Sequence, residues 1–165
     1  MSEVAPLDPE RLLKTLQRHR VKFVLIGALA ARMHGFPRLT ADADITPAED
    51  RANLDRLAAA LKDLDAKVYT ESVPAGLTFD CSGPALARAR MWNLVTKAGR
   101  LDIAFSPAGT DGYKDLTKDA EEFEAFGVSF FVASLDDIIR SKEAAGRPKD
   151  ADDLLVLRAL KKMRK

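Results

Sequence analysis

The segment from residue 23 to residue 46 constrains the fold of this chain more than any other. It opens with four apolar residues, Phe23-Val24-Leu25-Ile26, which are typical of a buried strand, and the strand stops at Gly27. A short helical segment and a Gly/Pro loop follow, and the chain then presents Asp42 and Asp44. Alternate residues of a strand face the same side of a sheet, so these two carboxylates share one face. This arrangement predicts a site for phosphate and metal.

Apolar spacing predicts further elements on both sides of this segment. Asp8 caps a helix that has Pro9 in its first turn, and Thr46 with Pro47 caps a second helix that ends at about residue 62. Residues 66–83 mix short β-like runs with prolines and glycines, and we assign no element there. The other expected elements are a hairpin of strands 92–96 and 100–105 turning at Ala98-Gly99, a strand at 128–132, a helix opened by Ser134 and a last helix from about residue 149.

These elements predict an α/β (α+β) fold, in which a short mixed sheet is flanked by helices and followed by a helical C-terminal part. A chain of 165 residues with 47% hydrophobic composition can build one core. We expect residues 1–132 to form that core with an N-terminal helix, and residues 133–165 to pack on it within a single domain.

Composition excludes several classes of protein. The chain has 26 Lys and Arg against 25 Asp and Glu, so its total charge does not indicate a nucleic-acid binder. Basic residues concentrate at 11–22 and 158–165, as a basic rim or as ordinary solvated helix faces. A single cysteine, Cys81, excludes an intrachain disulfide and argues against zinc. With no signal-like N-terminus and no apolar run near the roughly 20 residues of a membrane span, we expect a soluble cytoplasmic protein without a membrane partner.

A third carboxylate, Asp102, belongs with Asp42 and Asp44 if their strands are neighbours. In the predicted strand 100–105 the apolar residues share one face, so Asp102 points the other way. Three like charges side by side are unfavourable unless a cation neutralises them. Carboxylate oxygens suit Mg²⁺, and two such ions stabilise the attacking and leaving oxygens of an in-line displacement at phosphorus. Backbone N–H groups at the Gly27-Ala28 turn would bind a phosphate.

These residues together resemble those of the nucleotidyltransferase superfamily with the polymerase-beta-like fold. That superfamily combines an apolar strand, a Gly, a helix, a D-x-D-hydrophobic string and a later single Asp. More narrowly, the chain is similar over about residues 21–157 to the AbiEii type, the toxin-like nucleotidyltransferases of type IV toxin–antitoxin systems. The segments that carry the similarity are Leu25-Ile26-Gly27-Ala28-Leu29-Ala30, His34-Gly35, Pro37 to Ile45, Ser134 to Ile139, Lys142, Arg147 and Lys149-Asp150-Ala151-Asp152-Asp153-Leu154.

The resemblance implies a function and a role for each matching residue. A nucleoside monophosphate would move from an NTP to a hydroxyl acceptor on tRNA, a protein or a small molecule, with two Mg²⁺ ions as cofactors and a cognate antitoxin as a possible partner. Asp42 and Asp44 would bind the metals, and Asp102 would complete the metal site or accept the proton of the attacking hydroxyl. The remaining implied roles are an approach of Gly27 and Ala28 to the triphosphate, a phosphate contact for Lys142, loop or phosphate contacts for Arg38 and Thr40, and orientation of Lys142 by Asp150 or Asp153.

Two alternatives stay open. Ala28 stands where the superfamily usually has Ser or Gly, so a side-chain hydroxyl is absent and a non-catalytic, nucleotide-binding relative acting as a binding or antitoxin-like partner is an alternative. The string Asp42-Ala43-Asp44-Ile45-Thr46 also satisfies the D-x-D-x-T motif of haloacid-dehalogenase-like phosphohydrolases. That motif needs an apolar run directly before it, and residues 37–41 do not supply one. We also expect His34 to be a turn or cap residue and Trp92 to be a core residue.

Overall fold

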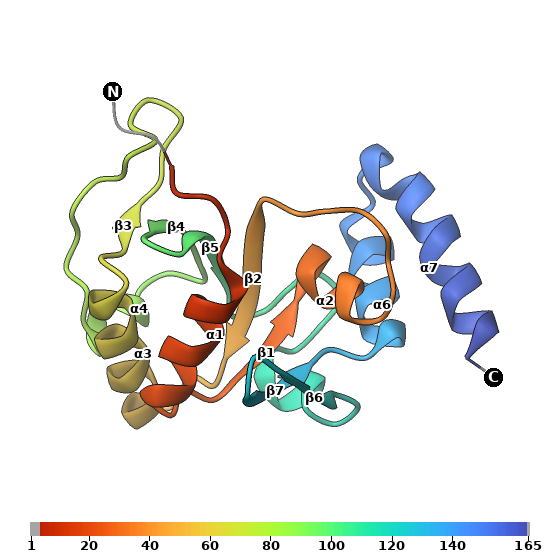
Figure 1. The fold of residues 1–165 in the computed structure, drawn as a ribbon, viewed down its shortest axis with the longest axis horizontal. Helices are drawn as coiled ribbons and strands as arrows, with labels where there is room; N and C mark the ends of the chain where they lie inside the picture. Colours follow the sequence, from red (N-terminus) through yellow and green to blue (C-terminus); the bar gives the residue numbers. More distant parts are fainter. Residues whose placement is uncertain (1–3, 165) are drawn as a thin grey trace.

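The computed structural model of this chain describes residues 4–164, which fold around one mixed sheet of seven strands (Figure 1). The strand order is β3-β4-β5-β2-β1-β7-β6, and the pairs β2–β5 and β1–β7 are parallel while the others are antiparallel. The strands are β1 Phe23–Ile26, β2 Asp42–Pro47, β3 Lys67–Val68, β4 Met91–Thr96, β5 Gly99–Ala104, β6 Glu121–Ala125 and β7 Val128–Val132. The predicted mixed sheet flanked by helices is confirmed.

The helices lie in two groups on either side of the central strand β2 (Figure 1). One group, with α3 and α4, accompanies the β3–β4–β5 part of the sheet, and the other, with α2, α6 and α7, lies beyond β1, while α1 packs against both α3 and β7. The helices are α1 Pro9–Arg18, α2 Gly27–Met33, α3 Arg51–Asp63, α4 Gly83–Leu86, α5 Tyr113–Leu116, α6 Leu135–Ala145 and α7 Ala151–Met163, with a 3-10 turn at Pro148–Asp150 before α7.

Local capping explains why two of the helices begin where the sequence predicts. The Asp8 side chain accepts a hydrogen bond from the backbone N–H of Arg11 at 3.1 Å, and α1 follows with Pro9 as its first residue. In the same way Ser134 Oγ accepts from the N–H of Asp137 at 3.1 Å at the start of α6. The predicted strands 23–26 and 128–132 and the hairpin of β4 and β5 are also confirmed.

One predicted cap is wrong. Thr46 and Pro47 do not open a helix, because β2 continues through both residues and pairs Thr46 with Val24 of β1. Helix α3 begins four residues later, and Asp50 caps it by accepting from the N–H of Asn53 at 3.1 Å. The Thr-Pro signal is overridden because the sheet supplies a long-range ladder partner that the local sequence does not reveal.

The segment left unassigned in the sequence is mostly irregular in the structure. Strand β3 has two residues, and a single bridge joins Val68 to Leu77. Gly76 packs closely on this short edge, because a Cβ there would lie 2.7 Å from Cγ1 of Val95. The segment therefore closes the β3–β4 edge of the sheet without extending it.

The basic residues of the two ends do not meet in a single rim. Helices α1 and α7 lie well apart in Figure 1. Many of their cations have local carboxylate partners, such as Lys14 with Glu10 at 2.7 Å and Lys161 with Asp136 at 2.6 Å. The interpretation as solvated helix faces therefore holds for these pairs. Within residues 4–164, no helix combines the length and the apolar character needed to cross a membrane.

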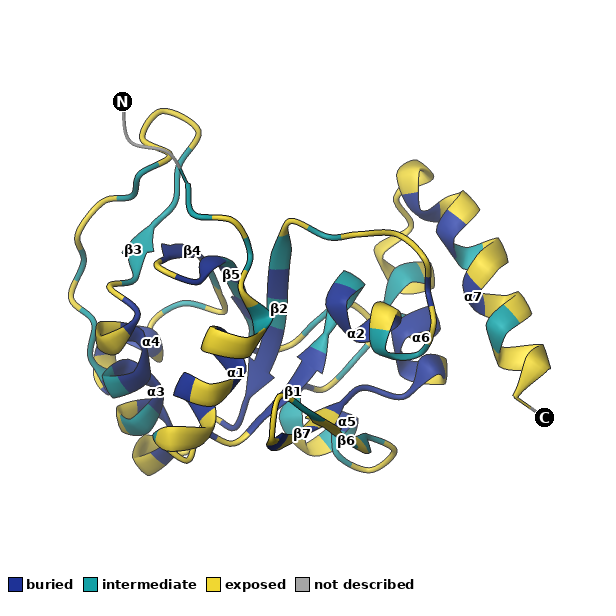
Figure 2. Cartoon of the chain, in the orientation of Figure 1, coloured by how far each residue is buried: buried dark blue, intermediate teal, exposed yellow. Residues whose placement is uncertain are grey.

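Burial is concentrated around β1, β2 and the helices that pack on them (Figure 2). Leu25 and Ile45 on these strands are fully buried, as are Leu12 and Leu16 on α1. Helix α7 is exposed along much of its length and anchors through buried Leu157, with Leu154 and Leu160 partly buried beside it. The strands that carry the candidate site residues therefore belong to the best-packed part of the molecule.

Candidate active site

Strand register places the three predicted carboxylates together. Strands β2 and β5 run parallel, with Asp44 opposite Asp102 and Asp42 opposite Arg100. These four residues share one face of the sheet, because the alternate residues on both strands, Ala43, Ile45, Leu101 and Ile103, are fully buried on the other face. We call Asp42, Asp44, Arg100 and Asp102 the carboxylate floor.

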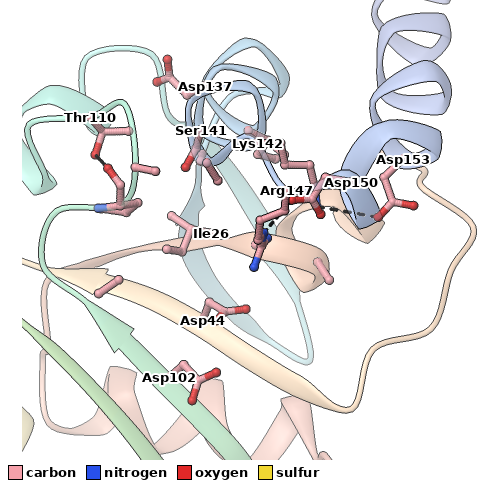
Figure 3. Close-up of a pocket in the computed structure, with 18 of the residues that line it drawn as sticks. Ile26, Asp44, Asp102, Thr110, Asp137, Ser141, Lys142, Arg147, Asp150 and Asp153 are labelled. Carbon is pink, nitrogen blue, oxygen red and sulfur yellow. Dashed lines mark hydrogen bonds and ion pairs between the residues drawn. The ribbon is translucent and has the colours of Figure 1, made fainter.

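The floor lies at the bottom of a cleft of about 690 Å³ (Figure 3). Across from Asp44 and Asp102, the figure shows Lys142 of α6 together with Arg147, Asp150 and Asp153 at the junction of α6 and α7. We call these last four residues the ion-paired wall. A third side of the cleft carries Thr110, Leu116, Asp137 and Ser141. The tertiary structure thus brings residues that are far apart in the sequence, such as Asp42 and Asp153, to the lining of one cavity.

Burial and mutual repulsion raise the pKa of two floor carboxyls. The pKa of Asp44 rises from 3.8 to about 7, first through burial and then through the charges of Asp42 and Asp102. The pKa of Asp102 rises to about 6, mainly through burial, with Arg100 opposing the shift and Asp42 adding to it. Arg100 and Lys142 both act to lower the pKa of Asp44. The free protein thus holds these carboxyls in a setting that disfavours their charged form.

Gly27 approaches the floor more closely than any other residue type could. It is the first residue of α2, directly after β1, and has a φ of +70°. A Cβ at this position would lie 2.9 Å from the carboxyl carbon of Asp44, and closer still to its Oδ2. Glycine is required here both for the positive φ and for the contact with Asp44. Ala28 also lines the cleft, but its methyl group offers no hydrogen bond.

Thr40 and Arg38 serve different parts of the cleft. Thr40 Oγ1 lies 3.1 Å from Oδ1 of Asp42 and accepts a hydrogen bond from the backbone N–H of the same residue at 3.3 Å. It therefore fixes the orientation of the first floor carboxylate. Arg38 lines the cleft, and its Nη2 lies 2.8 Å from Oδ1 of Asp153. Arg38 thus joins the loop before β2 to the first turn of α7.

The ion-paired wall is charge-compensated within itself. Lys142 Nζ lies 3.2 Å from Oδ1 of Asp150 and 3.7 Å from Oδ2 of Asp153, and Arg147 Nε donates to Oδ2 of Asp150 at 2.7 Å. The Asp150 side chain is only 4% exposed. Its burial acts to raise the pKa, but the hydrogen bonds from Arg147 and Lys142 outweigh burial and leave the pKa lowered. Lys142 thus contacts both Asp150 and Asp153, the two residues expected to orient it, and their role stays a prediction.

The floor has the donor chemistry of a magnesium site without forming a closed cage. Within residues 4–164, no three His, Cys, Asp or Glu side chains converge as a complete ligand set for an ion. The three floor carboxylates nevertheless offer hard oxygens, repel one another and face an open cleft. Mg²⁺ binds through one or two carboxylates and completes its shell with water and substrate phosphates. The residues present fit such an ion in company with a phosphate ligand.

Comparison with known proteins identifies a shared fold through solved structures. No protein-family model matches the chain, and no curated protein matches it either. Several solved structures have a similar fold, among them the three described next. A Thermotoga maritima protein described as a candidate nucleotidyltransferase is 17% identical with a TM-score of 0.56, covering 91% of this chain and 93% of its own. The lincosamide antibiotic adenylyltransferase LnuA, solved with lincomycin, is 15% identical with a TM-score of 0.60, covering 94% and 99%.

The third similar structure is the antibiotic-resistance factor ANT(2'')-Ia, at 17% identity and a TM-score of 0.52, covering 93% of this chain and 89% of its own. The fold is that of the nucleotidyltransferases. The nucleotidyltransferase fold agrees with the coarser resemblance drawn from the sequence. The narrower resemblance to the AbiEii type stays a prediction.

Arg100 is a floor residue that sequence reasoning missed. It occupies the same face as Asp102 because it stands two positions before it on β5, and that period-2 spacing was the available signal. Asp137 is a second missed residue of the cleft, and burial raises its pKa.

Two residues were expected to have a structural role and no part in the chemistry, and their positions agree with that expectation. His34 ends α2 and its Nε2 lies 2.8 Å from the carbonyl oxygen of Ala133, while Trp92 packs against the core.

Proposed function

We propose that this protein is a Mg²⁺-dependent nucleotidyltransferase that moves a nucleoside monophosphate from an NTP to a hydroxyl group. The observation that carries the proposal is the parallel pairing of β2 with β5, which sets Asp44 beside Asp102 at the bottom of a cleft whose opposite side bears Lys142. Carboxyl groups whose pKa is raised by burial and by neighbouring carboxylates within a cleft are typical of functional sites. The fold shared with LnuA, ANT(2'')-Ia and the Thermotoga protein supports the same activity.

The two sides of the cleft would hold different parts of the reaction. Asp42, Asp44 and Asp102 would hold Mg²⁺, which would supply positive charge for the transferring phosphoryl group. Lys142 would bind a phosphate oxygen from the opposite side, since it is held in place by Asp150 and Asp153 and its charge already acts on Asp44. Gly27 would let the backbone approach the triphosphate. Catalysis in such a site consists mainly of positioning and charge neutralisation.

Asp102 is our candidate for the group that takes the proton of the attacking hydroxyl. The acceptor oxygen would form a bond to the α-phosphorus, the bond from that phosphorus to pyrophosphate would break, and the hydroxyl proton would pass to a carboxylate oxygen of Asp102. Asp102 stands beside Asp44 on the floor and lines the cleft, so its carboxylate can reach a hydroxyl group that enters there. Asp102 is also partly exposed on the cleft side, with a side chain 19% accessible.

The acceptor defines the biological role. From the sequence resemblance we propose tRNA as the acceptor, within a toxin–antitoxin system in which a cognate antitoxin restrains the enzyme. The similar structures point to small molecules as a second class, since LnuA is described as an adenylyltransferase of lincosamide antibiotics. Both classes present a hydroxyl to the same floor, so the acceptor is tested directly below.

The structure disfavours the phosphohydrolase alternative. In haloacid-dehalogenase-like enzymes the first Asp of the motif is a nucleophile at the tip of a buried strand, whereas Asp42 opens β2 and the strand continues after it to Pro47. The non-catalytic alternative rests on Ala28, and it predicts nucleotide binding without transfer.

The test is a transfer assay with each labelled NTP, Mg²⁺ and three acceptor pools: total tRNA, total protein and lincomycin. We expect label transfer by the wild type and none by the Asp42→Ala, Asp44→Ala double variant. The matched control is the Asp111→Ala, Asp152→Ala double variant, which removes two exposed carboxylates that do not line the cleft. Binding of an NTP without transfer to any acceptor would support the non-catalytic relative, and release of phosphate from a phosphomonoester would favour the phosphohydrolase.

A further inference from the structure

Arg100 has an unusual setting for an arginine beside three carboxylates. Its guanidinium lies over the ring of Tyr69, 3.9 Å from the ring centroid, and its Nη2 lies 3.5 Å from Oδ1 of Asp102. The Nε of Arg100 is buried and has no hydrogen-bond partner among the described residues. The guanidinium is therefore held flat by stacking and by a long ion pair, while part of its hydrogen-bonding capacity is unused.

Arg100 belongs to the floor itself because of its position in the sheet. It lies opposite Asp42 in the β2–β5 register and lines the cleft, and it acts on the pKa values of both Asp44 and Asp102. With all groups ionised, the floor has three negative charges and one positive charge. Removing Arg100 would leave the same three carboxylates with no cation on the sheet.

We propose that Arg100 is a resident countercation of the floor, which interacts with Asp102 in the free protein. As a consequence, a divalent ion binds tightly to the floor only together with a triphosphate. The inference rests on the proposed function, because it assigns the floor to a metal ion. An ion that arrives alone competes with Arg100 for Asp102 and meets a floor already one charge less negative. A triphosphate adds oxygen ligands and negative charge, so the metal and the triphosphate bind together better than either alone.

Stacking on Tyr69 suits this role. An arginine stacked on an aromatic face keeps its position without using its N–H donors, and Arg–aromatic contacts are typical cation–π interactions. The separation of 3.5 Å from Asp102 is long for an ion pair, so a metal ion that arrives with a triphosphate can displace this contact. Arg100 is thus a positioning residue for Asp102, and it need not contact the substrate.

The test measures Mn²⁺ binding directly, at pH 8 and without any catalytic readout. Protein-bound Mn²⁺ is measured by equilibrium dialysis with Mn²⁺ alone and with the preformed complex of Mn²⁺ and inorganic triphosphate, which avoids any choice of base, and the protein-free compartment accounts for the Mn²⁺ that triphosphate chelates by itself. The variants are Arg100→Gln, Arg100→Met and Arg100→Lys. The matched control is Arg51→Gln, which removes an exposed arginine from α3, a helix that contributes no residue to the cleft.

We expect the wild type to bind Mn²⁺ weakly alone and at least about tenfold more tightly with triphosphate, because the triphosphate offsets the charge of Arg100. Arg100→Gln and Arg100→Met should bind Mn²⁺ alone at least about tenfold more tightly than the wild type, a gain that a merely structural arginine would not produce. Arg100→Lys and Arg51→Gln should stay close to the wild type. Adding Asp102→Asn to Arg100→Gln should remove the gain.

Several outcomes would overturn the inference. Equal or weaker Mn²⁺ binding by Arg100→Gln and Arg100→Met, in protein that circular dichroism shows to be folded, would show that Arg100 does not compete for the floor. The methionine variant guards against misfolding, because its apolar side chain can still pack on Tyr69. If the wild type binds Mn²⁺ with triphosphate but the Arg100 variants show no gain, only this inference fails. If no variant and no wild type binds Mn²⁺ under either condition, the proposed metal-dependent function fails as well.

Discussion

The carboxylate floor and the ion-paired wall face each other across one cleft, and both are built on aspartates. On the floor, burial and mutual repulsion raise the pKa values of Asp44 and Asp102. On the wall, Arg147 and Lys142 lower the pKa of Asp150 although its side chain is almost inaccessible to solvent. The charged form of an aspartate side chain is therefore disfavoured on the floor and favoured on the wall. The difference lies in direct contact, because Arg147 and Lys142 both hydrogen-bond to Asp150, whereas Arg100 and Lys142 act on Asp44 only through their charge, against burial and two neighbouring carboxylates.

This contrast separates two tasks within the cleft. The wall is complete in the free protein, since its cations and carboxylates satisfy one another and keep Lys142 in a fixed position. The floor is incomplete, because its excess negative charge is relieved only when a cation is added. We therefore expect the floor to lower the stability of the free protein and the wall to raise it. Substitutions on the two sides should have opposite signs.

The largest effect on stability should come from Asp44→Asn. Asp44 ionises at 3.8 in the unfolded chain and at about 7 in the folded protein, so the folded protein holds the extra proton between these values. Stability then falls as the pH rises through this window, by up to about 4 kcal/mol at pH 8, and is unaffected below it. Asp44→Asn removes this penalty. Unfolding by denaturant in the presence of EDTA should give the Asp44→Asn variant a higher free energy of unfolding than the wild type at pH 8. At pH 4 the two free energies should be equal.

The control for this prediction is Asp152→Asn, which removes an exposed carboxylate from α7. It should leave the free energy of unfolding within about 0.5 kcal/mol of the wild type. A loss of stability in Asp44→Asn at pH 8 would mean that the floor stabilises the free protein, and the contrast with the wall would disappear.

Asp150→Asn should have the opposite sign and a cost of about 3 kcal/mol at pH 7, because it leaves Lys142 and Arg147 without their buried partner. The pKa of Asp150 is lowered in the folded state, so its contribution is present above the unfolded pKa and is lost as the pH falls through the folded value. The cost should therefore shrink under strongly acidic conditions. Unfolding curves at pH 7 and pH 3 check both statements.

A second variant sharpens the interpretation of Asp150. If the cost arises from a stranded cation, Lys142→Met combined with Asp150→Asn should recover part of the lost stability, since one unpaired ammonium is removed. No recovery in the double variant would attribute the cost to packing and would weaken the description of the wall as an ion-paired unit.

Gly27→Ala should cost about 2 kcal/mol, since an L-residue pays about 1–2 kcal/mol for a left-handed backbone conformation and its Cβ must also displace Asp44. The matched control is Gly127→Ala, where φ is +77° and a Cβ would meet nothing within 4 Å. Both variants carry the backbone penalty, but only Gly27→Ala should weaken Mn²⁺-triphosphate binding. Equal binding by the two variants would show that the close approach of Gly27 to Asp44 has no part in the site.

Arg38→Gln should have the smallest effect, below about 1 kcal/mol, because the Arg38 side chain is 62% exposed and exposed ion pairs contribute little. Asp153 keeps a second partner in Lys142 at 3.7 Å. Thermal unfolding measures the change. A loss above about 2 kcal/mol would place Arg38 inside the wall, as a residue on which the junction of α6 and α7 depends.

Local signals in the sequence were sufficient for several elements. The Asp8-Pro9 and Ser134 caps lie within three residues of the N–H groups they bind, and the hairpin of β4 and β5 turns within two residues. Thr46-Pro47 misled for the opposite reason, because its partner, β1, is about twenty residues away. Arg100 was overlooked although its spacing to Asp102 was visible, since an arginine on a strand is commonly a solvated residue.

The sequence by itself determined which side chains share a face: the period of two places Asp42 with Asp44 and separates Asp102 from its apolar neighbours, because the pleat of a strand fixes this alternation. It also determined the need for glycine at the end of β1. Only the tertiary structure decided that β5 lies directly beside β2, in a parallel register that sets Asp44 next to Asp102 and Arg100 next to Asp42. Strand neighbours and register depend on long-range packing of the opposite face, where Ile45, Leu101 and Ile103 are buried together.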